Sequence, residues 1–264
     1  MIKEKYGINL LKVGLKLNFG KFSRYLKIIA SYIRFYLMIK AGKKVYSSFN
    51  SKKIILICAL PKSGSTWLET VLSNEEKFLP LMPPEVIKWE QKYGRSDTFI
   101  PTDGFIENVP KGRWIIKIHS NYSDKLFDLI NLNNNILKVI VLYRDIEEVM
   151  ESQLKYSTST KFHPDFHILN KINSHNEKLD YLKERYLNDY ILWIEKWRSV
   201  NNSKIKIVSY QNLIENSFKE FRNLFNHIEE SISDTELNDL LIKYNKKNMR
   251  KTTVNKSFYS RKLK

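Results

Sequence analysis

The chain is short of cysteine, since Cys58 is the only one among its 264 residues. A lone thiol excludes an internal disulfide framework, so the sequence predicts a protein of the reducing cytoplasm. The lack of cysteine also argues against a zinc site. None of the five histidines has a cysteine at metal-ligand spacing, and the segment that holds His163 and His167 is interrupted by Pro164. We therefore expect no metal in the functional site.

Glycine is scarce as well, with eight residues and none after Gly112. The triphosphate-binding P-loop needs a Gly, four residues and then Gly-Lys-Ser/Thr, whereas here Lys62 precedes Gly64. This order counts against the usual nucleoside-triphosphate kinases and GTPases. A nucleotide-dependent kinase stays as an alternative, with Asp145 as its metal-binding acid.

Acidic residues are outnumbered, with 28 against 45 basic ones and a net charge of +17. The excess is at the two ends. Residues 1–53 contain 13 Lys or Arg and one acid, residues 241–264 contain nine and none, and the remainder is slightly acidic. Because no basic stripe crosses the centre and no recognition motif is present, we do not expect nucleic acid as a partner.

Long apolar runs are also missing. Four polar residues form one narrow helical stripe between Phe22 and Ile39: Arg24, Lys27, Ser31 and Arg34. These interruptions exclude the roughly 18 uninterrupted apolar residues of a spanning helix and predict a basic amphipathic helical region over residues 1–50. Two interpretations stay open. Either residues 1–53 lie on an anionic membrane surface, which makes the protein peripheral on the inner face of the membrane, or the helix packs on the domain.

The chain does contain a turn typical of anion binding. Residues 54–60 are a continuous apolar run, which predicts a strand buried on both faces in a parallel sheet. The turn Pro61–Trp67 follows it and leads into a helical pattern. Gly64 lets backbone amides approach an anion, and the helix N-terminus adds partial positive charge. Lys62, Ser65 and Thr66 can donate directly to phosphate-like oxygens, and Ser63, Gly64 and Trp67 complete the expected binding turn.

This turn resembles the phosphosulfate-binding loop of the sulfotransferases that use 3′-phosphoadenosine 5′-phosphosulfate (PAPS). In that family a strand ends at an Arg, and a Ser eight residues later shares the 3′-phosphate with it. Here residues 137–143 form the apolar run, Arg144 follows it, and Ser152 lies eight residues on. The planar guanidinium has the donor geometry that a phosphate requires. The resemblance implies that Arg144 and Ser152 hold the 3′-phosphate, unless Arg144 pairs with Asp145 or Glu147 as a structural cap.

Two further segments extend the likeness. Residues 208–216 resemble the family's Tyr-Glu-Asp-Leu-x-x-Asn segment, which implies that Tyr210 lies near the adenine together with Trp67. The tail 258–262 resembles the start of an Arg-Lys-Gly loop, which assigns Arg261 and Lys262 to the 3′-phosphate. Leu263 stands where the family has Gly, and Arg250-Lys251 competes for the same role.

The resemblance also supplies a catalytic base. Residues 114–119 end in Lys-x-His, as in the family's Lys-Thr-His-Leu-Pro, where the His removes the acceptor proton. His119 is the first candidate, with Lys62 and Lys117 neutralising charge on the bridging and leaving oxygens. Glu85 is the alternative base, because it resembles a Glu that serves this role in glycan sulfotransferases. Glu85 also fits a helix N-terminus, where its charge stabilises the helix dipole.

Together these patterns predict a P-loop-like α/β fold in three layers, with a central, mostly parallel sheet flanked by helices. Residues 51–264 would form the sulfotransferase domain. The predicted activity is sulfuryl transfer from PAPS to a hydroxyl of a glycan, a glycolipid or a small alcohol or phenol. Residues 79–110 would shape the acceptor site, and residues 155–175 would form a mobile lid. The second interpretation is a nucleotide-binding protein with impaired catalysis, since the C-terminal glycine loop is missing.

Overall fold

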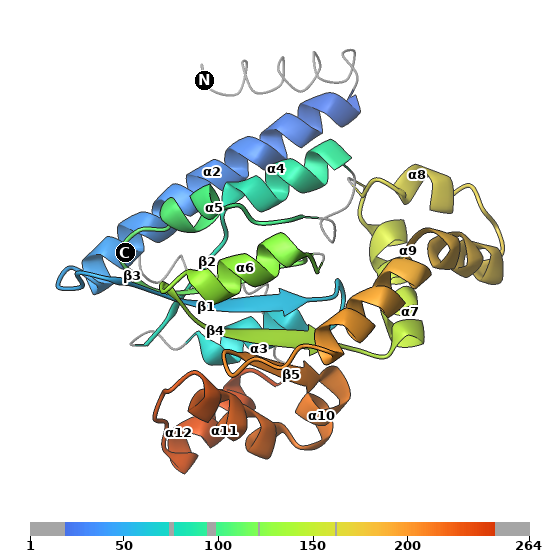
Figure 1. Ribbon diagram of the computed structural model, residues 1–264. Helices are drawn as coiled ribbons and strands as arrows, with labels where there is room; N and C mark the ends of the chain where they lie inside the picture. Colours follow the sequence, from blue (N-terminus) through green and yellow to red (C-terminus); the bar gives the residue numbers. More distant parts are fainter. Residues whose placement is uncertain (1–18, 74–76, 94–98, 121, 162, 246–264) are drawn as a thin grey trace.

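The computed structural model describes residues 19–73, 77–93, 99–120, 122–161 and 163–245. Its centre is a five-stranded parallel sheet in the order β2-β3-β1-β4-β5 (Figure 1). The strands are β1 (Lys52–Ala59), β2 (Leu79–Leu81), β3 (Gly112–Ile118), β4 (Ile136–Tyr143) and β5 (Ile205–Ser209). The predicted α/β fold with a parallel sheet between helices is confirmed.

Helices cover both faces of the sheet. One layer contains α2 (Phe19–Val45), α4 (Pro84–Tyr93), α5 (Asp103–Glu107), α6 (Asp124–Leu132), α7 (Ile146–Ser159), α8 (Phe166–Leu169) and α9 (His175–Arg198). The opposite layer contains α3 (Ser65–Leu72), α10 (Tyr210–Glu215), α11 (Ser217–His227) and α12 (Asp234–Lys243). Its last three helices are seen below the sheet in Figure 1.

The composition of β1 explains why the sheet needs two layers. Ile54, Leu56 and Cys58 enter the core on the α2 and α6 side, whereas Ile55 and Ile57 enter the core on the α3 side. All five side chains are fully buried. A strand without polar alternation cannot leave either face to water, so it specifies a helical layer on each side.

Some elements differ from the sequence-based expectation. The segment 79–110 contains a short edge strand, β2, where Pro80 is tolerated because it lies outside the sheet's centre. Helix α6 was not predicted, although Ser123 caps it by accepting a hydrogen bond from the Leu126 amide at 3.2 Å. Segment 155–175 is partly helical, and the buried carboxylate of Asp165 ties it to α9 through the hydroxyl of Tyr186 at 2.8 Å.

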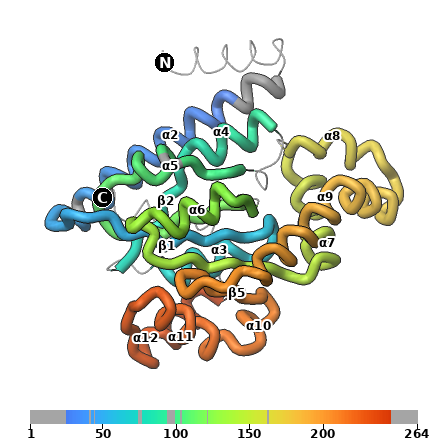
Figure 2. The backbone as a smooth tube through the Cα atoms, in the orientation of Figure 1, coloured from blue at the N-terminus to red at the C-terminus, as the bar shows by residue number. Residues whose placement is uncertain are grey.

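Helix α2 packs on the domain beside α4 and β2, as the tube in Figure 2 shows. Lys27 Nζ and Glu90 Oε1 are 3.0 Å apart, and Met38 is buried. The backbone also approaches Trp114 so closely at Gly42 that a Cβ there would lie 2.1 Å from the indole. Of the helices in the described ranges, none is long and apolar enough to cross a membrane. The domain boundary at residue 50 stays a prediction.

Candidate active site

The candidate site lies at the carboxyl edge of the central strands, where the connections diverge. After β1 the chain enters α3 on one face, whereas after β3 and β4 it enters α6 and α7 on the opposite face. In open α/β sheets, ligands bind in the crevice at such a divergence. The predicted loop 61–67 lies at this crevice.

The loop is built around two left-handed residues. Lys62 has φ 64° and Gly64 has φ 88°. Glycine adopts this conformation freely, but for lysine it costs about 1 kcal/mol or more, and such strain is concentrated at functional sites. Ser63 is buried, and its hydroxyl donates to the Leu60 carbonyl at 2.6 Å, which closes the turn. Gly64 then caps α3, so the first-turn amides of that helix face the crevice.

Helix α7 forms the opposite wall. The Nη1 of Arg144 donates to the Lys62 carbonyl at 3.3 Å, and its Nε donates to Glu148 Oε2 at 2.6 Å. Two turns further along α7, the ammonium of Lys62 lies 4.2 Å from the ring centroid of Tyr156. Ser152 is on the same helical face, midway between Glu148 and Tyr156, because residues four apart share a face. The structure therefore brings Arg144, Ser152 and Lys62 to one wall.

Tyr210 closes the side of the loop nearest α10. The Arg144 guanidinium lies 4.6 Å from its ring centroid, and the Trp67 ring meets it edge-on at 6.5 Å. At Gly64 a Cβ would lie 2.4 Å from the Tyr210 ring, so only glycine fits this contact. The Trp67 Nε1 is buried and has no hydrogen-bond partner within the described residues. The two predicted adenine contacts are thus adjacent to the loop.

Lys62 and Arg144 place two positive charges beside each other at the crevice. Burial lowers the pKa of the Lys62 ammonium, and the nearby charge of Arg144 lowers it further. Arg144 therefore disfavours the charged form of Lys62. A phosphate or phosphosulfate placed next to Lys62 would favour its charged form.

His119 lies just beyond β3, next to the end of β1. Its Nδ1–H donates to the Ala59 carbonyl at 2.8 Å, because a carbonyl oxygen only accepts. In the neutral ring, Nε2 then carries the lone pair, which is the form of a general base. This hydrogen bond fixes both the tautomer and the position of the ring at the carboxyl edge.

Lys117 lies on β3 and is already paired. Its Nζ donates to Glu69 Oε2 at 2.9 Å and to Thr66 Oγ1 at 3.1 Å. Both side chains of the ion pair are nearly buried, at 12% and 13% exposed. Lys117 therefore contacts the predicted loop through Thr66, with its charge balanced by α3.

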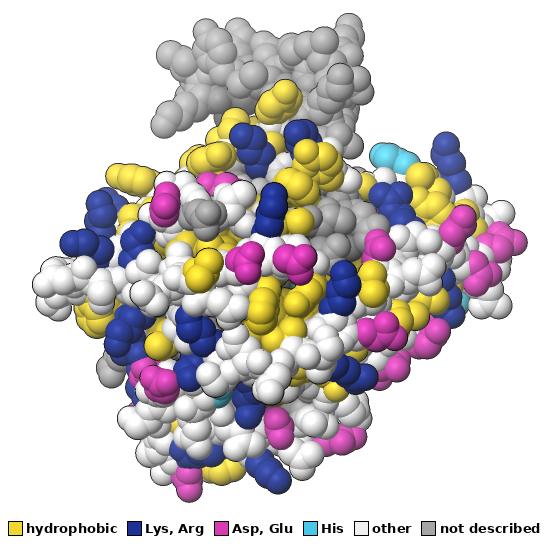
Figure 3. Space-filling model, in the orientation of Figure 1, with side chains coloured by type: hydrophobic (Ala, Val, Ile, Leu, Met, Phe, Trp, Pro, Cys, Tyr) yellow, Lys and Arg dark blue, Asp and Glu magenta, His cyan; other side chains and the backbone are white. Residues whose placement is uncertain are grey.

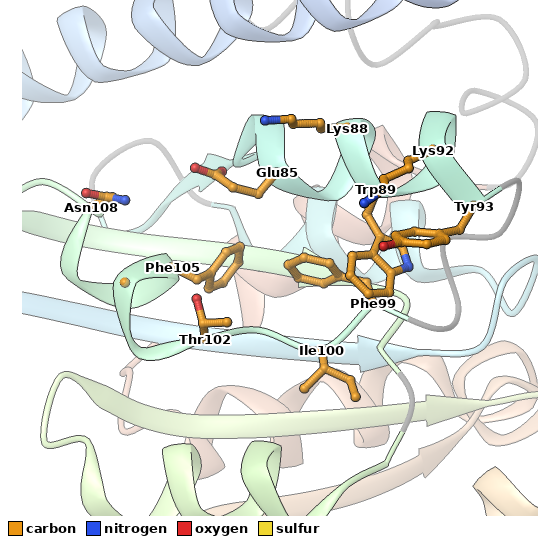
Figure 4. Close-up of a pocket in the computed structure, with 11 residues that line it drawn as sticks. Glu85, Lys88, Trp89, Lys92, Tyr93, Phe99, Ile100, Thr102, Phe105 and Asn108 are labelled. Carbon is orange, nitrogen blue, oxygen red and sulfur yellow. The ribbon is translucent and has the colours of Figure 1, made fainter.

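Glu85 lies elsewhere, in the first turn of α4. It lines a pocket of about 390 Å³ between α4 and α5, together with Phe105 and Asn108 (Figure 4). The other end of this pocket contains Phe99, whose backbone bridges to Ser120, the residue after His119. Arg261 and Lys262, and the competing pair Arg250-Lys251, lie outside the described residues.

Three residues of the site were missed in the sequence. Tyr156 supports Lys62, Glu148 pairs with Arg144, and Glu69 pairs with Lys117. The signal for the first two was available, because both lie four residues from Ser152 on the predicted helix. Nothing in the sequence links Glu69 to Lys117. Within the described ranges, no group of three or more His, Cys, Asp or Glu residues could hold a metal ion.

Comparisons with known proteins agree with this arrangement. The sulfotransferase domain model matches residues 52–263. No curated protein sequence matches the chain. The structure of a mouse sulfotransferase in complex with 3′-phosphoadenosine 5′-phosphate (PAP) superimposes on this structure with a TM-score of 0.58. The two sequences are 17% identical, and the match covers 83% of this chain and 73% of the mouse chain.

Two more solved structures share the fold. A retinol dehydratase solved with androsterone and the inactive cofactor PAP gives a TM-score of 0.55 at 12% identity, with 82% and 71% of the two chains covered. A sulfotransferase from Mycobacterium avium gives 0.52 at 10% identity, with 87% and 78% covered. Because the domain model spans most of the sequence, this chain belongs to the sulfotransferase-domain family.

Proposed function

We propose that this sulfotransferase moves the sulfuryl group of PAPS to a hydroxyl acceptor, with His119 as the general base. One observation carries the proposal: Lys62, Arg144 and Tyr210 converge on the Gly64 turn at the carboxyl edge of β1. The rings of Trp67 and Tyr210 meet edge-on beside the loop and supply apolar surface for an adenine base. The presence of PAP in the solved complexes of the structurally similar mouse sulfotransferase and retinol dehydratase agrees with this assignment.

Each part of the crevice has a role in binding. The amides of the α3 first turn, with Lys62, Ser65 and Thr66, would hold the 5′-phosphosulfate. Arg144 has five N–H donors, and two are used in the contacts described, so the others remain for a 3′-phosphate shared with Ser152. Trp67 and Tyr210 would contact adenine. Ser63 holds the turn, and Arg261 and Lys262 would add to the 3′-phosphate grip.

The chemistry requires a proton acceptor and a stabilised leaving group. His119 Nε2 takes the proton of the acceptor hydroxyl while the hydroxyl oxygen forms a bond to the sulfur of PAPS. At the same time, the bond between sulfur and the bridging phosphate oxygen breaks. Lys62 balances the negative charge that develops on the departing oxygen. Lys117 acts indirectly by orienting the Thr66 hydroxyl. Glu85 is the alternative base, and its place in the α4–α5 pocket fits an acceptor contact better.

That pocket is our candidate for the acceptor site. Four aromatic rings line it: Trp89, Tyr93, Phe99 and Phe105. Flat apolar rings favour a sugar face or a phenol, and the charged Glu85, Lys88 and Lys92 offer hydrogen bonds to hydroxyls. We therefore propose that the acceptor is a glycan, a glycolipid or a small alcohol or phenol. We also propose that the enzyme works in the cytoplasm, bound peripherally to the anionic inner face of the membrane. Nucleic acid is not among the proposed partners.

Calorimetry and sulfate transfer test the function together. The full chain should bind 3′-phosphoadenosine 5′-phosphate (PAP) more tightly than ATP, and labelled PAPS should transfer sulfate to a component of a membrane lipid extract or a hydroxyl panel. A preference for ATP would defeat the assignment and favour a kinase. Tight PAP binding without transfer to any acceptor would instead favour the nucleotide-binding protein.

A further inference from the structure

Helix α2 is packed with its polar stripe inward and its apolar face outward. Ser31 is 8% exposed, and Lys27 and Arg34 are half-buried on the same inner side. The outer face carries six large apolar side chains that are each 47% to 67% exposed: Tyr25, Leu26, Ile29, Tyr32, Ile33 and Tyr36. A helix that only covered a core would face the other way. The outer face needs a further contact to remove this surface from water.

The orientation of α2 is fixed by its inner contacts. Lys27 is paired with Glu90 of α4, Met38 is buried, and Gly42 lies directly against Trp114. Rotating the helix to bury its apolar face would break the ion pair and push side chains into Trp114. The exposed apolar face is therefore a stable feature of the fold.

Basic residues continue this outer face. Lys40 and Lys43 are exposed and follow Ile33 and Tyr36 along the same side of the helix, as their spacing requires. The described part of α2 has no acidic residue, and residues 1–53 carry 13 Lys or Arg against one acid. Figure 3 shows hydrophobic side chains along the outer edge of α2 with basic ones beside them. An apolar strip flanked by lysines complements a surface that is apolar inside and negative outside.

We propose that the outer face of α2 docks the protein on the interface of an anionic lipid bilayer. The helix lies in the plane of the membrane, with the isoleucines and Leu26 below the headgroups and the lysines at the lipid phosphates. Three of the six exposed side chains are tyrosines, whose rings and hydroxyls suit the boundary between hydrocarbon and water. This charge pattern favours lipid over a second copy of the chain, because two such faces would bring lysines together.

Docking on a membrane has a consequence for the choice of acceptor. This consequence rests on the proposed sulfotransferase function. Helix α4 lies directly beneath α2 and supplies Trp89 and Tyr93 to the α4–α5 pocket. A bilayer held on α2 is thus one helix layer from that pocket. The arrangement favours an amphiphilic acceptor, whose hydroxyl-bearing headgroup enters the pocket while its lipid stays in the membrane.

Vesicle flotation of the full chain tests the docking. We expect binding to vesicles of phosphatidylcholine with 30% phosphatidylglycerol and weak binding to phosphatidylcholine alone. The double variant Ile29→Gln/Ile33→Gln should lower the partition coefficient at least about tenfold. Lys40→Glu/Lys43→Glu should lower it for anionic vesicles by about fivefold per lysine or more. Leu132→Gln is the matched control, because Leu132 is 80% exposed on α6 and its loss should change nothing.

Two results would overturn the docking proposal. One is equal flotation of the wild type and the Ile29/Ile33 variant. The other is a dimer in sedimentation that this variant converts to a monomer, since the face would then bind a second copy. PAP calorimetry on the same variants separates the docking proposal from the nucleotide assignment. Unchanged PAP binding in a variant that no longer floats with vesicles supports docking. Vesicle binding by a protein that does not bind PAP contradicts only the nucleotide assignment.

Discussion

Single residues at the crevice are held by aromatic rings as much as by opposite charges. The Lys62 ammonium lies on Tyr156, and the Arg144 guanidinium lies on Tyr210. A ring attracts a cation by about 1–2 kcal/mol in a partly buried site, which orients the side chain without supplying a full negative charge. Lys62 also has the strained positive φ. These features preorganise Lys62 for an anion.

The lowered pKa of Lys62 predicts a pH-dependent affinity for PAP. A bound anion favours the ammonium, so binding weakens as pH rises through the lysine pKa, and burial together with Arg144 brings this loss below the usual value of about 10.4. Lys62→Arg stays charged and should flatten the profile at pH values below the usual lysine pKa of about 10.4. Calorimetry across that range measures it, with the exposed Lys155→Arg as control. An equally steep profile in Lys62→Arg would remove Lys62 from the anion site.

The base assignment makes a separate prediction. His119→Ala should lower sulfate transfer by about a hundredfold or more while PAP affinity stays within about twofold, because the imidazole acts on the acceptor proton. Glu85→Gln should retain most of the turnover and change mainly the KM for the acceptor. Retained turnover in His119→Ala, with loss in Glu85→Gln, would reverse the two roles.

At the scale of elements, one ion pair joins β3 to α3. Lys117 and Glu69 are nearly buried, and Lys117 also reaches Thr66 at the loop. Removing one member of such a pair leaves an uncompensated charge, whereas replacing both members removes the desolvation cost as well. The pair therefore fixes how the phosphate-binding loop sits against the sheet.

Urea denaturation distinguishes these cases. Lys117→Met should lower the free energy of unfolding by about 3 kcal/mol, and Lys117→Met/Glu69→Met should recover most of that loss. The exposed pair of Lys183 and Glu147 is the matched control, because solvent screens it and Lys183→Met should have little effect. If the single and double variants lost the same free energy of unfolding, the packing of the Lys117 side chain, and not its charge, would stabilise the contact between β3 and α3.

The elements also show what the sequence could predict. The strands β1, β3 and β4 contain the apolar stretches 54–59, 114–116 and 139–142. The loop follows β1 and Arg144 follows β4, so a parallel fold places both at the same edge of the sheet. Strand β2 was missed because it has three residues and an edge position. The Glu69–Lys117 contact depends on tertiary packing. The sequence identified both faces of α2, but only packing against Trp114 decides which one turns inward.

At the scale of the whole molecule, the crevice gathers elements from both helical layers. The loop and α3 and α10 belong to one layer, and Arg144 with α7 belongs to the other. A nucleotide bound there contacts both sides of the sheet at once. Ligand binding should thus stabilise the fold as a unit and not a single loop.

Thermal unfolding with PAP measures this coupling. At a free concentration of about 100 Kd, PAP should raise the free energy of unfolding by about 2.7 kcal/mol, and the Tm by about 5–10 °C for a chain of this size. Arg144→Met should lose most of the shift, since Arg144 contacts the loop, α7 and Tyr210 together. The unliganded Tm of that variant controls for misfolding, and Leu132→Gln should keep the full shift. A full shift in Arg144→Met would mean that PAP binds outside this crevice. A ligand bound in the crevice should lose affinity when Arg144 is replaced, because Arg144 contacts both of its walls.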